Sequence, residues 1–297
     1  MTVAPLIVTD STCDLAPALY AQYDIQLVPL HVLFGEESYR SGIDMDLPQF
    51  VERLNRGDHH PSTSQPTVGD FVKIFESLVE QGRPILSIHV STGLSGTFNA
   101  AHQAAQQLMQ SKPELSITVW DSQTISAALG FQVLAAARAA AAGHSVEEIL
   151  PLLESMRREA DFLFTLDDLS YLVRGGRIGQ VQYRMGQVLN IKPIITVSKA
   201  GETLGTYITA GRARSLDKTV EAFVKIMVNQ VGEGAKIRAM AFHGIGKSID
   251  LAAKLEARVR ESFDCVFYET AYSTPVLGVH VGPLALDIGF VAGEWDV

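Results

Sequence analysis

Residues 88–97 read Ile88-His89-Val90-Ser91-Thr92-Gly93-Leu94-Ser95-Gly96-Thr97, an apolar strand that passes through a hydroxyl-rich turn into a helix. The turn places hydroxyl groups and backbone N–H groups at the start of the helix, where the helix dipole favours an anion. We therefore expect a carboxylate or phosphate site, with Ser95 and the Gly96 amide as donors. On these residues alone, an ordinary helix cap explains the turn equally well.

Strands and helices alternate on both sides of this segment. An apolar strand at 6–9 ends at Asp10-Ser11-Thr12, which we expect to cap a helix at 15–20. Further strands are expected at 85–90 and 116–120, and helices at 69–81, 97–110 and 127–142, with a loop at 57–67. Such strand-then-helix units predict a parallel sheet between two helical layers, which binds ligands beyond the strand C-termini.

The second half has a different pattern. Two apolar runs, 191–197 and 204–209, flank Lys199-Ala200-Gly201-Glu202 and predict a hairpin. Strands at 162–166, 236–242 and 265–269, a helix at 248–262 and a Gly/Val-rich segment at 276–291 complete this half. We expect an α/β protein of two domains with the ligand between them: a parallel-sheet, three-layer domain at 1–160 and a mixed-sheet α/β domain at 161–297.

Composition excludes several classes of function. The chain has 297 residues and a formal net charge of −9, and no basic face is visible, so we expect no nucleic-acid partner. Its two cysteines, Cys13 and Cys265, suggest neither a disulfide framework nor a zinc site, which fits a reducing compartment. The most apolar helix, 127–142, is too short for a membrane span. We expect a soluble, cytoplasmic protein without integral membrane association.

Two other segments carry candidate chemistry. The loop His60-Pro61-Ser62-Thr63-Ser64-Gln65-Pro66-Thr67 is stiffened by two prolines and rich in hydroxyls, although a plain surface turn is the commoner explanation. The segment Pro275-Val276-Leu277-Gly278-Val279-His280-Val281-Gly282-Pro283 places His280 between valines, where spacing alone favours a core residue. The histidines show no paired metal-ligand spacing outside His59-His60, so we expect no metal.

Together these motifs resemble the DegV family of bacterial fatty-acid-binding proteins over nearly the whole chain. The matching segments occur in the family's order: Thr9–Thr12, Thr63–Phe71, Ile88–Thr97, Asp121-Ser122, Tyr171-Leu172, Gly175–Gly179, Leu189–Ile194 and Gly278–Pro283. The resemblance implies a two-domain α/β protein that holds one long-chain fatty acid in an internal tunnel. It also implies no cofactor, and a separate ATP-dependent fatty acid kinase that receives the presented carboxylate and makes an acyl phosphate for phospholipid metabolism.

The resemblance also suggests which residues contact the ligand. Thr63 and Ser95 match family residues whose hydroxyls bond the ligand carboxylate, and His280 matches a histidine close to the same head group. Their neighbours Ser64 and Thr97 are further candidate contacts.

Two arginines, and one segment whose sequence differs from the family's usual motif, complete the comparison with the family. Arg177 and Arg212 are candidate contacts for the partner or the head group, although surface arginines are more often solvated. The family's usual GPGALG reads Gly282–Asp287 here, so Leu284 and Asp287 replace two glycines. This departure questions the local backbone path and the shape of the pocket.

Two classes of function therefore remain to be separated. The leading hypothesis is a fatty acid carrier that is not itself an enzyme. The alternative is a small acyl hydrolase that uses Ser95 and His280, although Ser95 does not stand in a G-x-S-x-G elbow. A carrier needs apolar space that ends at hydroxyl donors, whereas a hydrolase needs Ser95 within hydrogen-bond reach of a histidine held by an acid.

Overall fold

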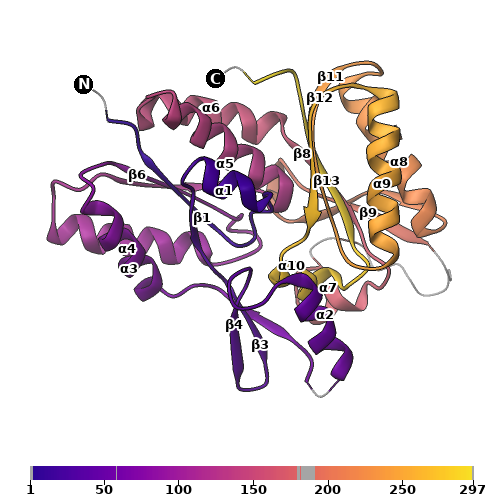
Figure 1. Cartoon of the computed structure of the whole chain (residues 1–297), viewed down its shortest axis with the longest axis horizontal. Helices are drawn as coiled ribbons and strands as arrows, with labels where there is room; N and C mark the ends of the chain where they lie inside the picture. The colour runs from indigo at the N-terminus through magenta and orange to yellow at the C-terminus, as the bar shows by residue number, and fades with distance from the viewer. Residues whose placement is uncertain (1–2, 58, 179–180, 182–190, 296–297) are drawn as a thin grey trace.

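The computed structural model describes residues 3–57, 59–178, 181 and 191–295, and two sheets of different construction organise them (Figure 1). The fold is α/β, with one parallel and one mixed sheet, as the strand patterns predict. Gly179, Leu189 and Asn190 of the motifs quoted above lie outside the described residues. No helix among the described residues is long and apolar enough to span a membrane.

The first sheet is parallel throughout, with strand order β2-β1-β6-β7. Its strands are β1 (Leu6–Asp10), β2 (Gln26–Val28), β6 (Ile85–His89) and β7 (Ile117–Asp121). Leu6 and Val8 pack beneath the helices α3 (Val68–Val79) and α4 (Thr97–Ser111). Ile7 points the opposite way, toward α5 (Ser126–Ala141). This alternation places helices on both faces and confirms the parallel three-layer arrangement.

A small antiparallel sheet, in the order β4-β3-β5, extends from the first half at the bottom of Figure 1. It comprises β3 (His31–Phe34), β4 (Glu37–Arg40) and β5 (Ser62–Ser64). The expected loop at 57–67 is therefore wrong in part, because β5 pairs with β3 and Thr63 lies opposite Val32. Between β4 and β5 lies α2 (Leu47–Arg56), which begins with a capping box at Asp46.

The second sheet has the order β10-β9-β8-β13-β11-β12 and is mixed, because only β11 and β12 run parallel. Its strands are β8 (Asp161–Thr165), β9 (Lys192–Val197), β10 (Tyr207–Ala213), β11 (Lys236–His243), β12 (Asp264–Tyr272) and β13 (Leu286–Ala292). The hairpin β9–β10 confirms the predicted pairing. The Gly/Val-rich segment divides into a helix, α10 (Pro275–Val281), and β13.

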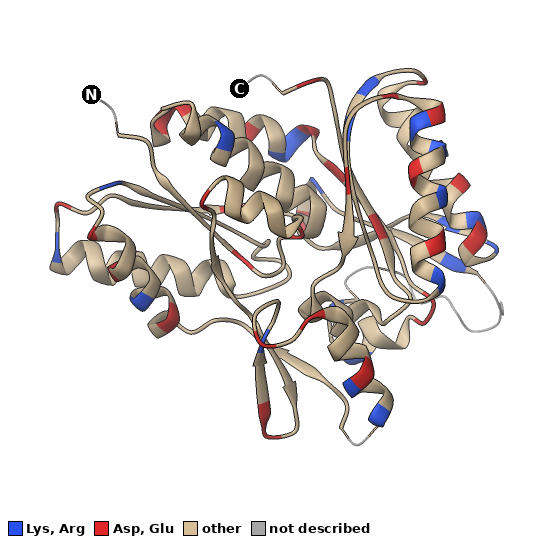
Figure 2. Cartoon of the chain, viewed as in Figure 1, with Lys and Arg blue, Asp and Glu red and all other residues tan. Residues whose placement is uncertain are grey.

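Two helices cover the outer face of this sheet, α8 (Leu216–Val231) and α9 (Lys247–Ser262). Sequence patterning predicts α9 but not α8. Acidic and basic side chains are interspersed on both helices (Figure 2), and ion pairs such as Lys247–Asp217 and Arg258–Glu221 link them. This interspersion gives these helices no single-sign face of the kind that binds nucleic acid.

The helix α5 lies between the two sheets and is buried almost all round. Its alanines allow close approach of both sheets: a Cβ added at Gly289 of β13 would lie 2.6 Å from the Ala127 Cβ. One hydrophobic cluster therefore runs from β1 through α5 to β13. The short helix α6 (Val146–Glu159) precedes β8, where the sequence predicts the domain boundary.

At the far end of α5, Trp295 joins the two halves. The guanidinium carbons of Arg138 on α5 and Arg238 on β11 lie 4.8 Å and 4.5 Å from the Trp295 ring centroid. Phe131 and Phe267 also contact this ring, at centroid distances of 6.2 Å and 5.8 Å. The indole is thus held by side chains from both halves.

Candidate functional site

A cavity lies where β5, the turn before α4, and α10 meet, and we call it the head cavity. Its polar lining side chains are Thr12, Thr63, Gln65, Ser95, Arg177 and His280. Five segments that are distant in the sequence therefore contribute polar side chains to one space. The motifs that sequence analysis singles out converge here, beyond the C-terminal end of β6.

Thr63 and His280 form the best-defined pair in this cavity. The Thr63 Oγ1 lies 2.9 Å from the His280 Nε2. Burial, with a smaller effect of the Arg177 charge, lowers the pKa of His280 to about 4, so the imidazole is neutral at pH 7. The His280 Nδ1 is buried with no hydrogen-bond partner among the described residues, so we place the ring proton on Nε2. Nε2 then donates to Thr63, whose own hydroxyl hydrogen stays available for a ligand.

Ser95 sits at the start of α4, one residue before the N-cap Gly96. Its Oγ lies 2.9 Å from the Thr97 Oγ1 and accepts the Thr97 N–H at 3.3 Å. No side chain of the N-cap residue closes the first turn, since Gly96 has none. A methyl group at Gly96 would overlap the Gln65 carboxamide, so the Gln65 side chain would have to move to accommodate any larger residue. Gln65 stands in a quoted motif, yet nothing in the sequence distinguished it from its neighbours.

The two arginines and Ser64 occupy different surroundings. The exposed Arg177 donates to the Gly175 carbonyl at 2.7 Å and to the Leu94 carbonyl at 3.4 Å, at the rim of the head cavity. Arg212 is exposed on β10 and is not among the lining residues. Ser64 is also exposed and donates to the Gln65 carbonyl. The structure therefore brings Arg177 to the site, and leaves Arg212 and Ser64 outside the cavity lining.

Asp10 does not cap a helix, which corrects the expectation from its sequence context. The helix α1 (Pro17–Gln22) begins later, and its N-cap, Ala16, makes no side-chain cap. The Asp10 Oδ2 instead accepts the Val90 N–H and pairs with the His89 Nδ1, both at 3.0 Å. Burial alone would raise the pKa of Asp10, but hydrogen bonds from His89, Thr12 and Val90 hold it below its ordinary value. Asp10 thereby fixes the end of β6, from which the Ser95 turn departs.

A Ser–His–Asp sequence of hydrogen bonds does exist, but it is not accessible. The Ser87 Oγ lies 2.6 Å from the His89 Nε2, and His89 in turn contacts Asp10. All three residues are fully buried in the parallel sheet. At the head cavity, the Ser95 hydroxyl contacts Thr97 rather than His280. The hydrolase alternative is therefore not supported by the geometry of Ser95 and His280.

A second cavity, the tail cavity, adjoins the first. It is lined by Phe162 and Phe164 of β8 and by Ser126, Ser273, Ala285 and Asp287. Ile125, Tyr207, Leu277 and Val281 line both cavities, so apolar side chains connect the polar end to the tail cavity. Tyr207 and the two phenylalanines come from strands far from the motifs, and no local sequence signal identified them.

The departure at Leu284 and Asp287 leaves the backbone path regular. Gly244 donates to the Ala285 carbonyl at 2.8 Å, and β13 begins directly afterwards with Leu286 paired to Thr165. Leu284 lies beside Gly246, whereas Asp287 lines the tail cavity. The change therefore affects the shape of that cavity through Asp287.

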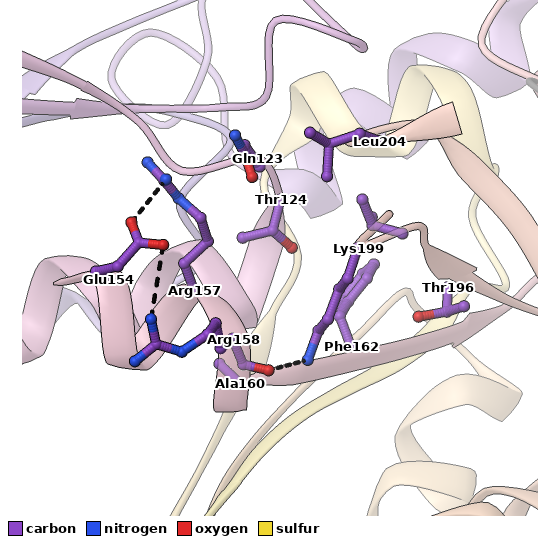
Figure 3. Close-up of a pocket in the computed structure, with 11 residues that line it drawn as sticks. Gln123, Thr124, Glu154, Arg157, Arg158, Ala160, Phe162, Thr196, Lys199 and Leu204 are labelled. Carbon is purple, nitrogen blue, oxygen red and sulfur yellow. Dashed lines mark hydrogen bonds and ion pairs between the residues drawn. The ribbon is translucent and has the colours of Figure 1, made fainter. Parts of the chain in front are cut away.

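Two further cavities lack the chemistry of the head cavity. One lies between α6 and the β9–β10 hairpin and contains Arg157, Arg158 and Lys199 (Figure 3). Each of these cations already has a partner: both arginines contact Glu154, and Lys199 pairs with Asp161 and the Arg158 carbonyl. We assign no ligand to this cavity.

The other is an open apolar cavity of about 590 Å³ between α1, the start of α2 and the end of β12. Its lining includes the carboxylate of Asp46 and no basic residue, which suits an uncharged group better than an anion. Within the described residues, no three His, Cys, Asp or Glu side chains converge as metal ligands would.

Comparison with known proteins gives consistent results over the whole chain. A family model described as an uncharacterised protein of the DegV family matches residues 5–293. A DegV domain-containing protein of Deinococcus radiodurans is 36% identical over 297 residues, covering 99% of both chains.

Solved structures match with similar coverage. A DegV family protein from Thermus thermophilus, described as fatty acid binding, superposes with a TM-score of 0.88 and 30% identity, covering 99% and 100% of the two chains. A stearic acid-binding protein from Eubacterium ventriosum superposes with a TM-score of 0.83 and 26% identity, covering 97% and 98%.

Proposed function

The chain belongs to the DegV family, and from that premise and the two adjoining cavities we propose that it binds one long-chain fatty acid. One observation carries the proposal: a polar cavity with Thr63, Ser95 and His280 continues, through shared apolar residues, into a second cavity lined by phenylalanines. An amphipathic ligand with one anionic end matches this division. The Thermus thermophilus and Eubacterium ventriosum relatives, described as binding fatty acid and stearic acid, support the same class of ligand.

The head cavity suits a carboxylate because its donors are uncharged groups with free hydrogens. Thr63 receives the His280 hydrogen and directs its own toward the ligand, and Ser95 offers a second hydroxyl at the N-terminus of α4. Gly96 and Thr97 shape this turn, and Arg177 adds a positive charge at the rim. A carboxylate can thus be bound without an oppositely charged group buried beside it.

The acyl chain would pass Ile125 and Tyr207 into the tail cavity, which makes the internal tunnel of our proposal. Each buried methylene contributes roughly 0.8 kcal/mol before the cost of ordering the ligand, so a chain buried over many methylenes dissociates slowly and should remain bound through purification.

We further propose that the protein presents the bound carboxylate to a separate fatty acid kinase and does not itself catalyse the transfer. Two features support a presenting role: the exposed Arg177 at the rim of the head cavity, and a Ser95 hydroxyl that, among the described residues, hydrogen-bonds Thr97 rather than a histidine or a carboxylate. A kinase that docks over Arg177 would meet the carboxylate end of the ligand rather than its tail. The phosphoryl group then comes from ATP bound to the kinase.

Native mass spectrometry of the purified protein, followed by lipid extraction, tests the ligand. We expect one long-chain fatty acid per chain, and uptake of stearate by delipidated protein at the same ratio. Delipidated, folded protein that binds neither stearate nor oleate would refute the proposal. An acyl phosphate formed from the loaded protein and ATP without a kinase would overturn the carrier role.

A further inference from the structure

We propose that Asp287 sets the maximum length of the acyl chain that the tail cavity accepts, an inference that rests on the fatty-acid-binding function proposed above. Asp287, Ser126 and Ser273 line the tail cavity and are not among the residues that line the head cavity. A residue at this end would contact the end of the chain, so its volume would determine how many methylenes fit.

The strand β13 points Asp287 into the tail cavity. It lies between Phe164 of β8 and Phe242 of β11, its cross-strand partners in the sheet, and its side chain is 5% exposed. Leu286 and Ile288, its neighbours in the sequence, instead pack into the hydrophobic cluster beneath α8 and α9. The alternation of the strand therefore assigns Asp287 to the face that α5 covers.

A hydrogen-bond network holds this end of the tail cavity, the closed end in our proposal, in place. The Ser126 hydroxyl lies 2.7 Å from the Asp14 Oδ2 and 3.4 Å from the Asp287 Oδ1. The other Asp14 oxygen accepts the Thr274 N–H at 3.0 Å. An acyl chain that pushed past Asp287 would separate these buried polar groups and leave them unpaired, which is costly. The network therefore resists a longer chain.

The closed end is also fixed by its backbone. Ser126 has a φ of +53°, a conformation that is strained for a residue with a Cβ, and its N–H donates to the Thr12 carbonyl at 2.9 Å. Residues from the segment before α1, from the start of α5, from the segment before α10 and from β13 thus meet at one point. Movement of the closed end would require all four to shift.

The closed end is compatible with an apolar chain because burial favours the neutral form of Asp287. Burial, reinforced by the nearby Asp14, raises the pKa of Asp287 well above its ordinary value. The lining residues on the approach to it are Phe162, Phe164, Leu277 and Val281. The terminal methyl group of an acyl chain then meets carbon atoms and a neutral acid, not a buried charge.

Replacement of Asp287 with alanine tests the proposal. Competition binding with a series of saturated acids from myristate to behenate gives the chain length that each variant prefers. Each additional buried methylene raises affinity about fourfold. We expect Asp287→Ala to shift the preferred acid to a longer one, with about a fifteenfold gain for an acid two carbons longer than the wild-type optimum. Asp287→Asn, which keeps the volume, should retain the wild-type optimum.

Two further variants keep the test decisive. Ser126→Gly removes the hydroxyl from the closed end, and its φ suits glycine, so it should also shift the optimum upward if Asp287→Ala does not fold. Ile288→Val shortens a side chain on the opposite face of the same strand and should leave the optimum unchanged.

The outcomes separate this inference from the function on which it rests. If wild-type protein binds fatty acids but folded Asp287→Ala and Ser126→Gly keep its optimum, the length limit is overturned and fatty acid binding stands. If wild-type protein binds no member of the series, the proposed function fails, and the length limit fails with it.

Discussion

Thr63 and His280 are 217 residues apart in the sequence, yet the Thr63 Oγ1 and the His280 Nε2 are 2.9 Å apart. The strand β5 delivers one residue and the helix α10 delivers the other, and these elements belong to different halves of the chain. A neutral histidine that donates to a threonine hydroxyl orients that hydroxyl toward the cavity. The head cavity is therefore assembled only when the two halves are packed together.

The first prediction concerns the two hydroxyls. Thr63→Ala and Ser95→Ala should each weaken fatty acid binding by about 1 to 3 kcal/mol, because a buried carboxylate loses a donor. Ser64→Ala is the matched control: Ser64 follows Thr63 on the same strand, is exposed, and should leave affinity unchanged. Titration calorimetry with delipidated protein measures these affinities. Full affinity in the folded double variant would place the head group elsewhere.

The second prediction concerns the protonation of His280. Because burial lowers its pKa to about 4, the ring should titrate near that value in NMR spectra and remain neutral between pH 6 and 8. Arg177→Ala removes the nearby positive charge, which is the smaller of the two causes. The pKa of His280 should then rise but stay below its ordinary value, because burial remains. A His280 ring that titrates near pH 6.5 would contradict the expected effect of burial on its pKa.

The third prediction concerns Arg177 as a docking residue. Arg177→Ala should slow kinase-dependent formation of the acyl phosphate and leave fatty acid affinity nearly unchanged, because docking and head-group contacts are separate interactions. Radiolabelled ATP consumption with kinase and loaded protein, beside direct lipid binding, measures both effects. Arg212→Ala is the control, since this exposed arginine on β10 does not line the head cavity. Equal losses of affinity and turnover in Arg177→Ala would instead place Arg177 against the ligand.

The fourth prediction concerns the buried acid Asp14. Burial raises its pKa from 3.8 to about 7, so the folded state binds the proton more tightly than the unfolded state does. This contribution to stability is complete below pH 3.8 and is lost as the pH rises to about 7, by at most roughly 1.4 kcal/mol per pH unit. His280, with its lowered pKa, acts in the opposite direction between about pH 4 and 6.5.

Comparison of wild-type protein with Asp14→Asn isolates this effect, because the His280 contribution is common to both. Urea unfolding at several pH values should show the wild type losing stability relative to the variant between pH 4 and 7. Parallel pH profiles for the two proteins would mean that Asp14 is ionised in the folded state.

Local patterning predicts much of the fold because many helices and strands can be recognised from a few consecutive residues. The run of alanines in α5 and the glycine turn before α4 both lie where the sequence indicates. The three-residue strand β5 is not recognisable in this way, because it is defined by pairing with β3, some 30 residues earlier in the chain. The expectation that Asp10 caps a helix is wrong for a related reason: its hydrogen-bond partner His89 is 79 residues away in the sequence.

The residues of the site also divide into those that the sequence identifies and those that it does not. Thr63, Ser95 and His280 belong to recognisable motifs, and the structure brings them together with Arg177. Tyr207 and Phe164 line the cavities because the second sheet places them there, and each reads in the sequence as an ordinary core residue of a strand. Which apolar residues line a cavity rather than fill a core is a tertiary property.

The burial of α5 between the two sheets constrains how a ligand is exchanged. Separation of the halves would expose the alanine face of α5 and pull Trp295 away from Arg138 or Arg238, so wholesale opening carries the cost of unfolding the shared core. Loading and release of the proposed ligand would then require local displacement of β5 and α10, two short elements that contribute to the lining of the head cavity. Exchange by this route would be slow compared with the rate at which the protein and a kinase collide. The lifetime of the complex between the protein and its fatty acid, rather than the affinity alone, would then decide whether a kinase reaches the acid while it is still bound.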